Sequence, residues 1–89
     1  MLKYINDSCY TQICDNIMFV MQKGNIGVYG SGRCWRLTML TGGHETVIAC
    51  FVISDDGYKC YKTCCESRLW TENEILSAAN KMIEDITSS

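Results

Sequence analysis

The chain has 89 residues, of which 47% are hydrophobic and 20% are charged. This balance is that of a globular protein and excludes intrinsic disorder, and the length allows one small core, so we expect a single domain over residues 1–89. Eight Lys and Arg against ten Asp and Glu give a net charge of −2, which lacks the basic excess typical of a nucleic-acid-binding protein.

The N-terminal segment predicts an amphipathic helix. Asp7 or Ser8 is suited to its N-cap, and Gly24 is suited to the left-handed position that follows a helix end. Between them, hydrophobic residues recur at helical spacing: Tyr10, Ile13, Cys14, Ile17, Met18 and Met21. The short apolar run 17–21 is also compatible with a strand, so that alternative stays open.

After this segment the hydrophobic pattern changes to a period of two, which predicts antiparallel strands rich in β-branched and aromatic residues. The strands are expected over 34–40, 46–53 and 58–65, with a shorter one over 26–29 before them. A loop over 41–45 joins the first pair, and a turn at 55–57 joins the next, where we expect Gly57 to supply a positive φ.

The C-terminal segment predicts a second amphipathic helix, over 72–86. Thr71 and Glu74 have the spacing of a capping box, and Trp70 and Ile75 have that of a hydrophobic staple. Hydrophobic residues then recur at helical spacing: Ile75, Leu76, Ala79, Met82, Ile83 and Ile86. The expected fold class is α+β: a three- to four-stranded antiparallel meander sheet flanked by an N-terminal helix and an amphipathic C-terminal helix.

The strand period divides the predicted sheet into two faces. If Leu40 faces Thr46, a core face under the helices holds Trp35, Leu37, Met39, Val47, Ala49 and Phe51. A second face then holds Cys34, Arg36, Thr38, Ile48, Cys50 and Val52. A three-residue turn at 55–57 would add Cys60, Lys62 and Cys64 to the second face and Tyr61 to the core face, whereas a two- or four-residue turn would exchange them. Either the second face is an exposed binding surface, or the N-terminal helix covers it.

Seven cysteines in so short a chain are typical of a disulfide framework in a secreted protein. The N-terminal sequence has no signal-peptide pattern, and the apolar runs 17–21 and 47–53 are too short to span a membrane. We therefore expect a cytoplasmic protein with mostly free thiols and no membrane partner. No C-x-x-C pair occurs, so we expect no metal site, although one register places Cys34, Cys50, Cys60 and Cys64 on the same face.

The sequence offers no constellation typical of catalysis. His44 is the only histidine and lies in the 41–45 loop, with nothing to place it beside a nucleophile. The glycines at 27, 30 and 32 lead into a strand, and not into the helix that a phosphate-binding loop requires. We expect neither enzymatic activity nor a cofactor.

The predicted order of elements is also that of a double-stranded RNA-binding domain. That class grips phosphates with a basic run at the start of its last helix. Here Glu72 and Glu74 occupy that place and would repel phosphate, so we expect no nucleic-acid partner. An RNA- or DNA-binding domain of this topology is kept as one alternative, and a thiol-based metal-binding or redox protein as another.

We expect a non-enzymatic accessory protein that binds a protein partner and inhibits or regulates it. Small α+β domains without motifs are common in phages and other mobile elements, including inhibitors of host defence, although this analogy is compositional. The simplest version is a homodimer formed through the sheet face. The residues expected to contact the partner are cationic and apolar side chains of the sheet and acidic side chains of the last helix: Arg36, Lys59, Lys62, Ile48, Val52, Glu72, Glu84 and Asp85.

Overall fold

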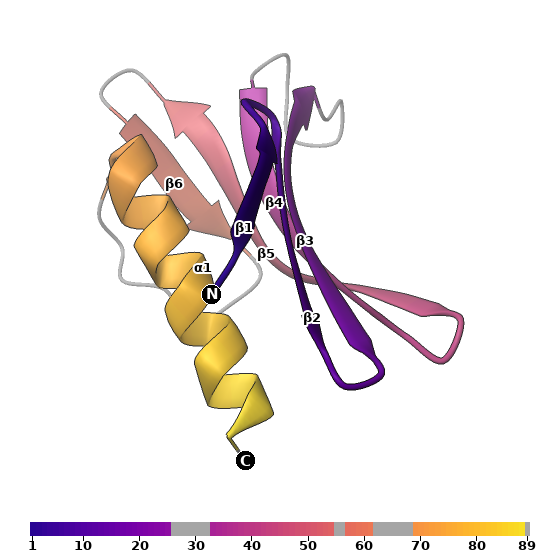
Figure 1. Cartoon of the computed structure of the whole chain (residues 1–89). Coiled ribbons are helices and arrows are strands. Elements are labelled where there is room, and N and C mark those ends of the chain that lie inside the picture. Colours follow the sequence, from indigo (N-terminus) through magenta and orange to yellow (C-terminus); the bar gives the residue numbers. More distant parts are fainter. Residues whose placement is uncertain (26–32, 55–56, 62–68, 89) are drawn as a thin grey trace.

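The computed structural model describes residues 1–25, 33–54, 57–61 and 69–88. The described elements are β1 (Lys3–Asn6), β2 (Cys9–Cys14), β3 (Ile17–Asn25), β4 (Arg33–Thr41), β5 (His44–Ser54), β6 (Gly57–Tyr61) and α1 (Glu72–Thr87), as Figure 1 shows. The strands form a six-stranded sheet in chain order, and each pairs antiparallel with the next. The fold class is α+β: an antiparallel meander followed by one C-terminal helix.

The predicted N-terminal helix is wrong, because this segment forms the hairpins β1–β2 and β2–β3. Cys14 pairs with Ile17, so Asp15 and Asn16 form a two-residue turn, and Asp15 has the positive φ of 54° that such turns require. The strand alternative for 17–21 is therefore the correct one. The order of elements also differs from that of a double-stranded RNA-binding domain, since no helix precedes the described strands.

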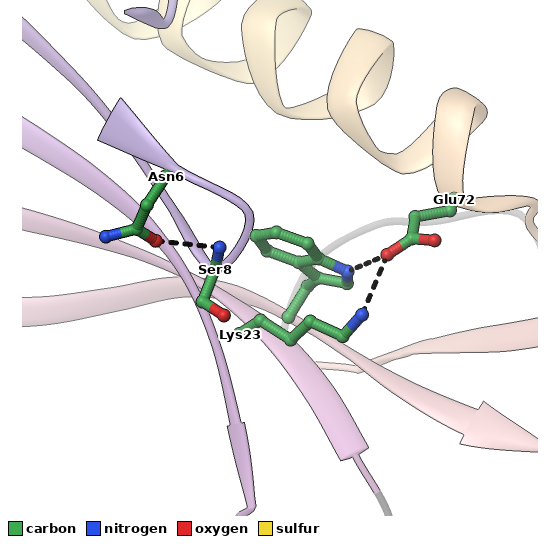
Figure 2. Close-up of polar contacts among 5 residues, drawn as sticks. Asn6, Ser8, Lys23 and Glu72 are labelled. Carbon is green, nitrogen blue, oxygen red and sulfur yellow. Dashed lines mark hydrogen bonds and ion pairs between the residues drawn. The ribbon is translucent and has the colours of Figure 1, made fainter. Parts of the chain in front are cut away.

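Several residues assigned to that helix take other roles in the described structure. Asp7 and Ser8 form the β1–β2 turn, where the Asn6 side chain accepts a 2.8 Å hydrogen bond from the Ser8 amide (Figure 2). Gly24 lies within β3 and does not have a positive φ. The strand predicted over 26–29 lies outside the described residues.

The predicted C-terminal helix is confirmed as α1, which crosses one face of the sheet (Figure 1). Its capping box is present: the Glu74 amide donates to Thr71 Oγ1 at 3.3 Å, and the Thr71 amide donates to Glu74 Oε1 at 3.0 Å. The helix buries Ile75, Ala79 and Ile83. No described helix is both long and apolar enough to cross a membrane.

The main core lies between α1 and the sheet. Its most fully buried large side chains come from three strands and the helix: Phe19, Met21, Leu37, Phe51, Ile75 and Ile83. Leu2 belongs to the same cluster, and its amide donates a 2.8 Å hydrogen bond to Asn80 Oδ1 on α1. The residue just before β1 is thus joined to α1 in the folded protein.

The register of β4 with β5 follows the prediction in the body of the sheet, where Trp35 pairs with Phe51 and Leu37 with Ala49. Near the turn it differs, because Gly42 and Gly43 form a two-residue turn with φ of 55° and 80°. Leu40 therefore pairs with Glu45, one residue away from the expected partner.

A β-bulge reconciles the two registers of this hairpin. The register shifts between Leu37 and Thr38, which leaves Ile48 as the extra residue on β5. Ile48 consequently packs against the main core, so its predicted place on the second face is wrong. Val47 pairs with Thr38 and not with a core-face residue, so its predicted place on the core face is wrong as well.

The turn between β5 and β6 has two residues, because Ser54 pairs with Gly57. Cys60 therefore pairs with Phe51 and packs against the core, as the two-residue alternative predicted. Lys62 and Cys64 lie outside the described residues. Gly57 does not have the expected positive φ. A Cβ at this position would lie 2.9 Å from the Trp70 carbonyl oxygen, so glycine is required by the close approach of another backbone segment.

Substitution of Gly57 by Ala should destabilise the fold. The new Cβ would also lie 3.2 Å from the Leu69 Cβ, and relief of these contacts should cost about 1–3 kcal/mol of unfolding free energy. Urea denaturation followed by circular dichroism measures this cost. Gly24→Ala is the matched control, since its Cβ would meet no atom within 4 Å and should change stability by no more than about 0.5 kcal/mol. Equal stability of the two variants would contradict the steric explanation.

Candidate functional site

Glu72 joins the start of α1 to the sheet. Its Oε1 accepts hydrogen bonds from Nε1 of Trp35 and from Nζ of Lys23, each at 3.1 Å (Figure 2). Lys23 and Trp35 are cross-strand partners on β3 and β4, and the Lys23 ammonium lies 5.6 Å from the Trp35 ring centroid. Since the Glu72 side chain is 54% exposed, its ion pair with Lys23 contributes only about 0–1 kcal/mol. Satisfying the indole N–H of the buried Trp35 is the larger contribution.

Three aromatic rings lead from the edge of the sheet to this contact. The ring of Tyr4 on β1 meets the ring of Tyr10 on β2 edge to face, with centroids 5.6 Å apart. The ring of Tyr10 then lies 6.0 Å from that of Trp35, at an interplanar angle of 54°. Tyr4 is exposed, Tyr10 is half-buried and Trp35 is buried, so the row of three rings extends from solvent to the core.

The β1–β2 turn places a carboxylate beside these rings. Tyr4 Oη donates a 2.7 Å hydrogen bond to Asp7 Oδ1, and this bond to a carboxylate raises the pKa of Tyr4. The Lys23 amide donates a 2.8 Å hydrogen bond to the Ser8 carbonyl oxygen, which fixes the turn against β3. The position of Asp7 therefore follows from the hairpin that the sequence pattern did not predict.

These elements enclose a hollow of about 230 Å³, which we call the Trp35 hollow. Its lining residues come from the β1–β2 turn, the sheet and the first turns of α1: Asp7, Tyr10, Met21, Trp35, Glu72, Asn73, Ile75 and Leu76. Among the described residues, the lining contains two carboxylates and no Lys, Arg or His, although Lys23 contacts the lining residues Glu72 and Trp35. Aromatic faces combined with carboxylates are suited to a cationic group.

A second feature lies at the β1 edge of the sheet. Four of the exposed large hydrophobic residues of the described chain lie on β1, on β2 or just before β1: Met1, Tyr4, Ile5 and Ile13, which are 88%, 61%, 57% and 71% exposed. We call these four residues the β1-edge surface. A shallow hollow of about 340 Å³ lies beside it, lined by Met1, Lys3, Thr11, Gln12 and Ile13.

The two edges of the sheet differ in how their backbone is paired. At the β6 edge, Tyr58 and Trp70 exchange two backbone hydrogen bonds of 2.9 Å. At the outer edge of β1, no other described strand pairs with the backbone. Within the described structure, the β1 edge therefore offers a row of backbone groups for a further strand, whereas the β6 edge is paired at Tyr58.

The structure separates the residues predicted to contact a partner. Arg36 is half-buried opposite Cys50, and Lys59 is exposed opposite Val52, both on the face away from α1. Val52 is buried with Cys34 and Cys50 and does not form an apolar strip in solvent. The remaining predicted residues lie elsewhere or cannot be placed: Ile48 packs against the main core, Glu72 lines the Trp35 hollow, Glu84 and Asp85 are exposed near the end of α1, and Lys62 lies outside the described residues.

Tyr4, Asp7, Tyr10 and the β1-edge surface were not among the predicted site residues. They were missed because a helix was predicted over residues that form two hairpins. The signal that could have found them is the pair of turn-forming polar dipeptides, Asp7–Ser8 and Asp15–Asn16, each between two short runs that contain hydrophobic residues.

The cysteines show a mixed state. Cys9, Cys14, Cys34 and Cys50 are free, whereas Cys60 is disulfide-bonded. Among the described residues, no group of three His, Cys, Asp or Glu side chains is arranged to hold a metal ion. His44 is exposed at the start of β5 and pairs with Thr41.

Cys34 and Cys50 form a buried thiol pair, each 1% exposed. The pKa of Cys50 is raised to about 11, chiefly by burial and also by charge repulsion from the neighbouring Cys34 and a hydrogen bond with it. Arg36 opposes this effect only in part. The reactive thiolate form of Cys50 is therefore scarce near neutral pH.

Alkylation of the native protein by iodoacetamide should be slower at Cys34 and Cys50 than at the half-buried Cys9 and Cys14. The pKa of Cys50 is raised, so its labelling rate should still increase as the pH rises from 9 towards about 11. The labelling rate of an ordinary thiol, with a pKa of about 8.5, changes little over the same range. Peptide mapping by mass spectrometry resolves the four sites, and labelling in urea supplies the control. A plateau below pH 9 at Cys50 would show that its thiolate is not disfavoured.

No protein-family model, curated protein or solved structure matches the chain.

Proposed function

We propose that this chain is a non-enzymatic, cytoplasmic accessory protein that binds a protein partner and inhibits or regulates it. The observation that carries the proposal is the β1-edge surface. Ile5 and Ile13 are each more than half exposed, although burial of such side chains is favourable by about 1.5–3 kcal/mol. Exposed apolar side chains on two neighbouring strands at the edge of a sheet are typical of a surface that another protein covers.

The backbone of β1 supports the same proposal. A partner segment in extended conformation can pair with the outer edge of β1 and so add a strand to the sheet. Main-chain hydrogen bonds would supply affinity, and the adjacent hollow beside Ile13 would accept a side chain of the partner. The β6 edge is less suited to this role, because Trp70 already pairs with Tyr58.

A second copy of the chain is the simplest partner of this kind. Two β1 edges related by a two-fold axis would present the same residues to each other, as an isologous interface requires. In that case light scattering should find a dimer for the unchanged protein and a monomer for the edge variant described below. A monomer in both cases would assign the surface to a different protein.

Ile5→Asp combined with Ile13→Asp should abolish partner binding without unfolding the domain, because both side chains are exposed. Loss of two central apolar contacts should weaken binding by at least about 30-fold, which corresponds to about 2 kcal/mol. Proteins captured on the immobilised chain are identified by mass spectrometry, and their affinity is then measured by calorimetry with the purified partner.

The matched control is Ile53→Asp, which changes a 43% exposed isoleucine on β5, on a strand distant from β1 in the sheet order. Binding that survives the β1-edge substitutions, or that is lost equally in the control, would refute the proposed surface. Circular dichroism melting of each variant establishes that it is folded.

A further inference from the structure

We propose that the Trp35 hollow binds the guanidinium or ammonium group of a basic side chain of the partner protein. This inference rests on the proposed function and specifies the chemistry of the partner. A basic residue that enters the hollow would lie beside the rings of Tyr10 and Trp35 and between the carboxylates of Asp7 and Glu72.

The charge of the hollow favours a cation. Asp7 accepts a hydrogen bond from the neutral Tyr4 hydroxyl and has no ion-pair partner among the described residues. In the part of the chain that the structure describes, no basic residue belongs to the lining. A carboxylate at the rim of an aromatic hollow is therefore left without a counter-charge, which a basic side chain would supply.

Lys23 provides an example of the proposed contact within the chain itself. Its ammonium lies 5.6 Å from the Trp35 ring centroid and 3.1 Å from Glu72 Oε1. The surroundings of the indole thus already accept one ammonium group, from the β3 side. A partner's basic residue would use the Asp7 side of the same rings.

An anionic ligand is the competing possibility, because the hollow adjoins the N-terminus of α1 and helix N-termini favour anions. Here Glu72 and Glu74 lie in the first turn of the helix and oppose that preference. The Asp7 carboxylate, which also lines the hollow, opposes it further. Since Glu72 is already paired with Lys23, the Asp7 carboxylate, which has no ion-pair partner among the described residues, is the charge that favours a cation over an anion here.

One lining residue of the hollow, Asp7, does not help to attach the helix to the sheet. That attachment is made by Glu72 with Lys23 and Trp35, and by the buried face of α1. Asp7 takes no part in it, since its hydrogen bond is to Tyr4 on its own hairpin. Asp7 can therefore be changed without disturbing the helix, which makes it the informative position for a test.

The probes are N-acetyl-arginine amide and N-acetyl-lysine amide, with N-acetyl-citrulline amide as the neutral counterpart of arginine. Binding is followed by nuclear magnetic resonance through the indole N–H signal of Trp35, and the signal of Trp70, which does not line the hollow, is the internal reference. We expect a saturable shift of the Trp35 signal with the two cationic probes, a much smaller one with citrulline, and none at Trp70.

Asp7→Asn should weaken binding of the arginine probe by about fivefold, the upper range for a partly exposed ion pair, while asparagine keeps the turn. Asp85→Asn removes an exposed carboxylate near the other end of α1, outside the hollow, and should leave the affinity unchanged. Equal weakening by both substitutions would show non-specific charge attraction and overturn the proposal. Equal shifts with citrulline would overturn it as well.

Failure of this inference is distinguishable from failure of the proposed function. If no cationic probe shifts the Trp35 signal while partner binding still requires Ile5 and Ile13, the hollow does not bind cations and the β1-edge surface stands. If the arginine probe binds the Ile5→Asp, Ile13→Asp variant normally while that variant retains its partner, the hollow stands and the edge surface does not.

Discussion

One helix has to close the core of a six-stranded sheet, and the structure depends on how it does so. A sheet with one uncovered apolar face is not stable in water, and the buried stripe of Ile75, Ala79 and Ile83 covers that face over Phe19 and Phe51. The hydrophobic contact has little direction of its own, so polar contacts at separate points fix the position of the helix. Glu72 bonds to the sheet at the start of α1, and Asn80 bonds to Leu2 one to two turns from its end.

The same arrangement explains where surfaces for binding arise. Because α1 begins next to Trp35, the junction of helix, sheet and β1–β2 turn leaves a hollow whose walls differ in chemistry: aromatic on the sheet side and acidic on the turn and helix sides. Because the meander starts with a short strand, its first edge is left with exposed apolar side chains. Both surfaces meet at Tyr4, which belongs to the edge and also positions Asp7. One partner could therefore use both.

The elements that were predicted correctly have local signals. The capping box of Thr71 and Glu74 specifies the start of α1 whatever the rest of the chain does, and the Gly42–Gly43 pair specifies a hairpin. The N-terminal segment was predicted wrongly because Tyr10, Cys14, Ile17 and Met21 fit helical spacing, while Tyr10 and Cys14 also fit one face of a strand. Pairing with β4, far along the chain, decides between them through contacts such as Met21 with Leu37. The hollow could not be predicted, since it requires both that pairing and the docked helix.

The order of the elements along the chain bears on the order of folding events. The hydrogen bond between Leu2 and Asn80, for example, can form only after α1 has been synthesised. Each strand pairs with its neighbour in sequence, and loops that close over short distances form quickly, so the hairpins can assemble while the C-terminal part of the chain is still being synthesised. The helix comes last in the sequence and has to be complete before it can cover Phe19, Met21 and Phe51. During that interval the sheet exposes its whole core face. The nascent chain is therefore most exposed to aggregation and most dependent on chaperones just before residues 72–87 emerge.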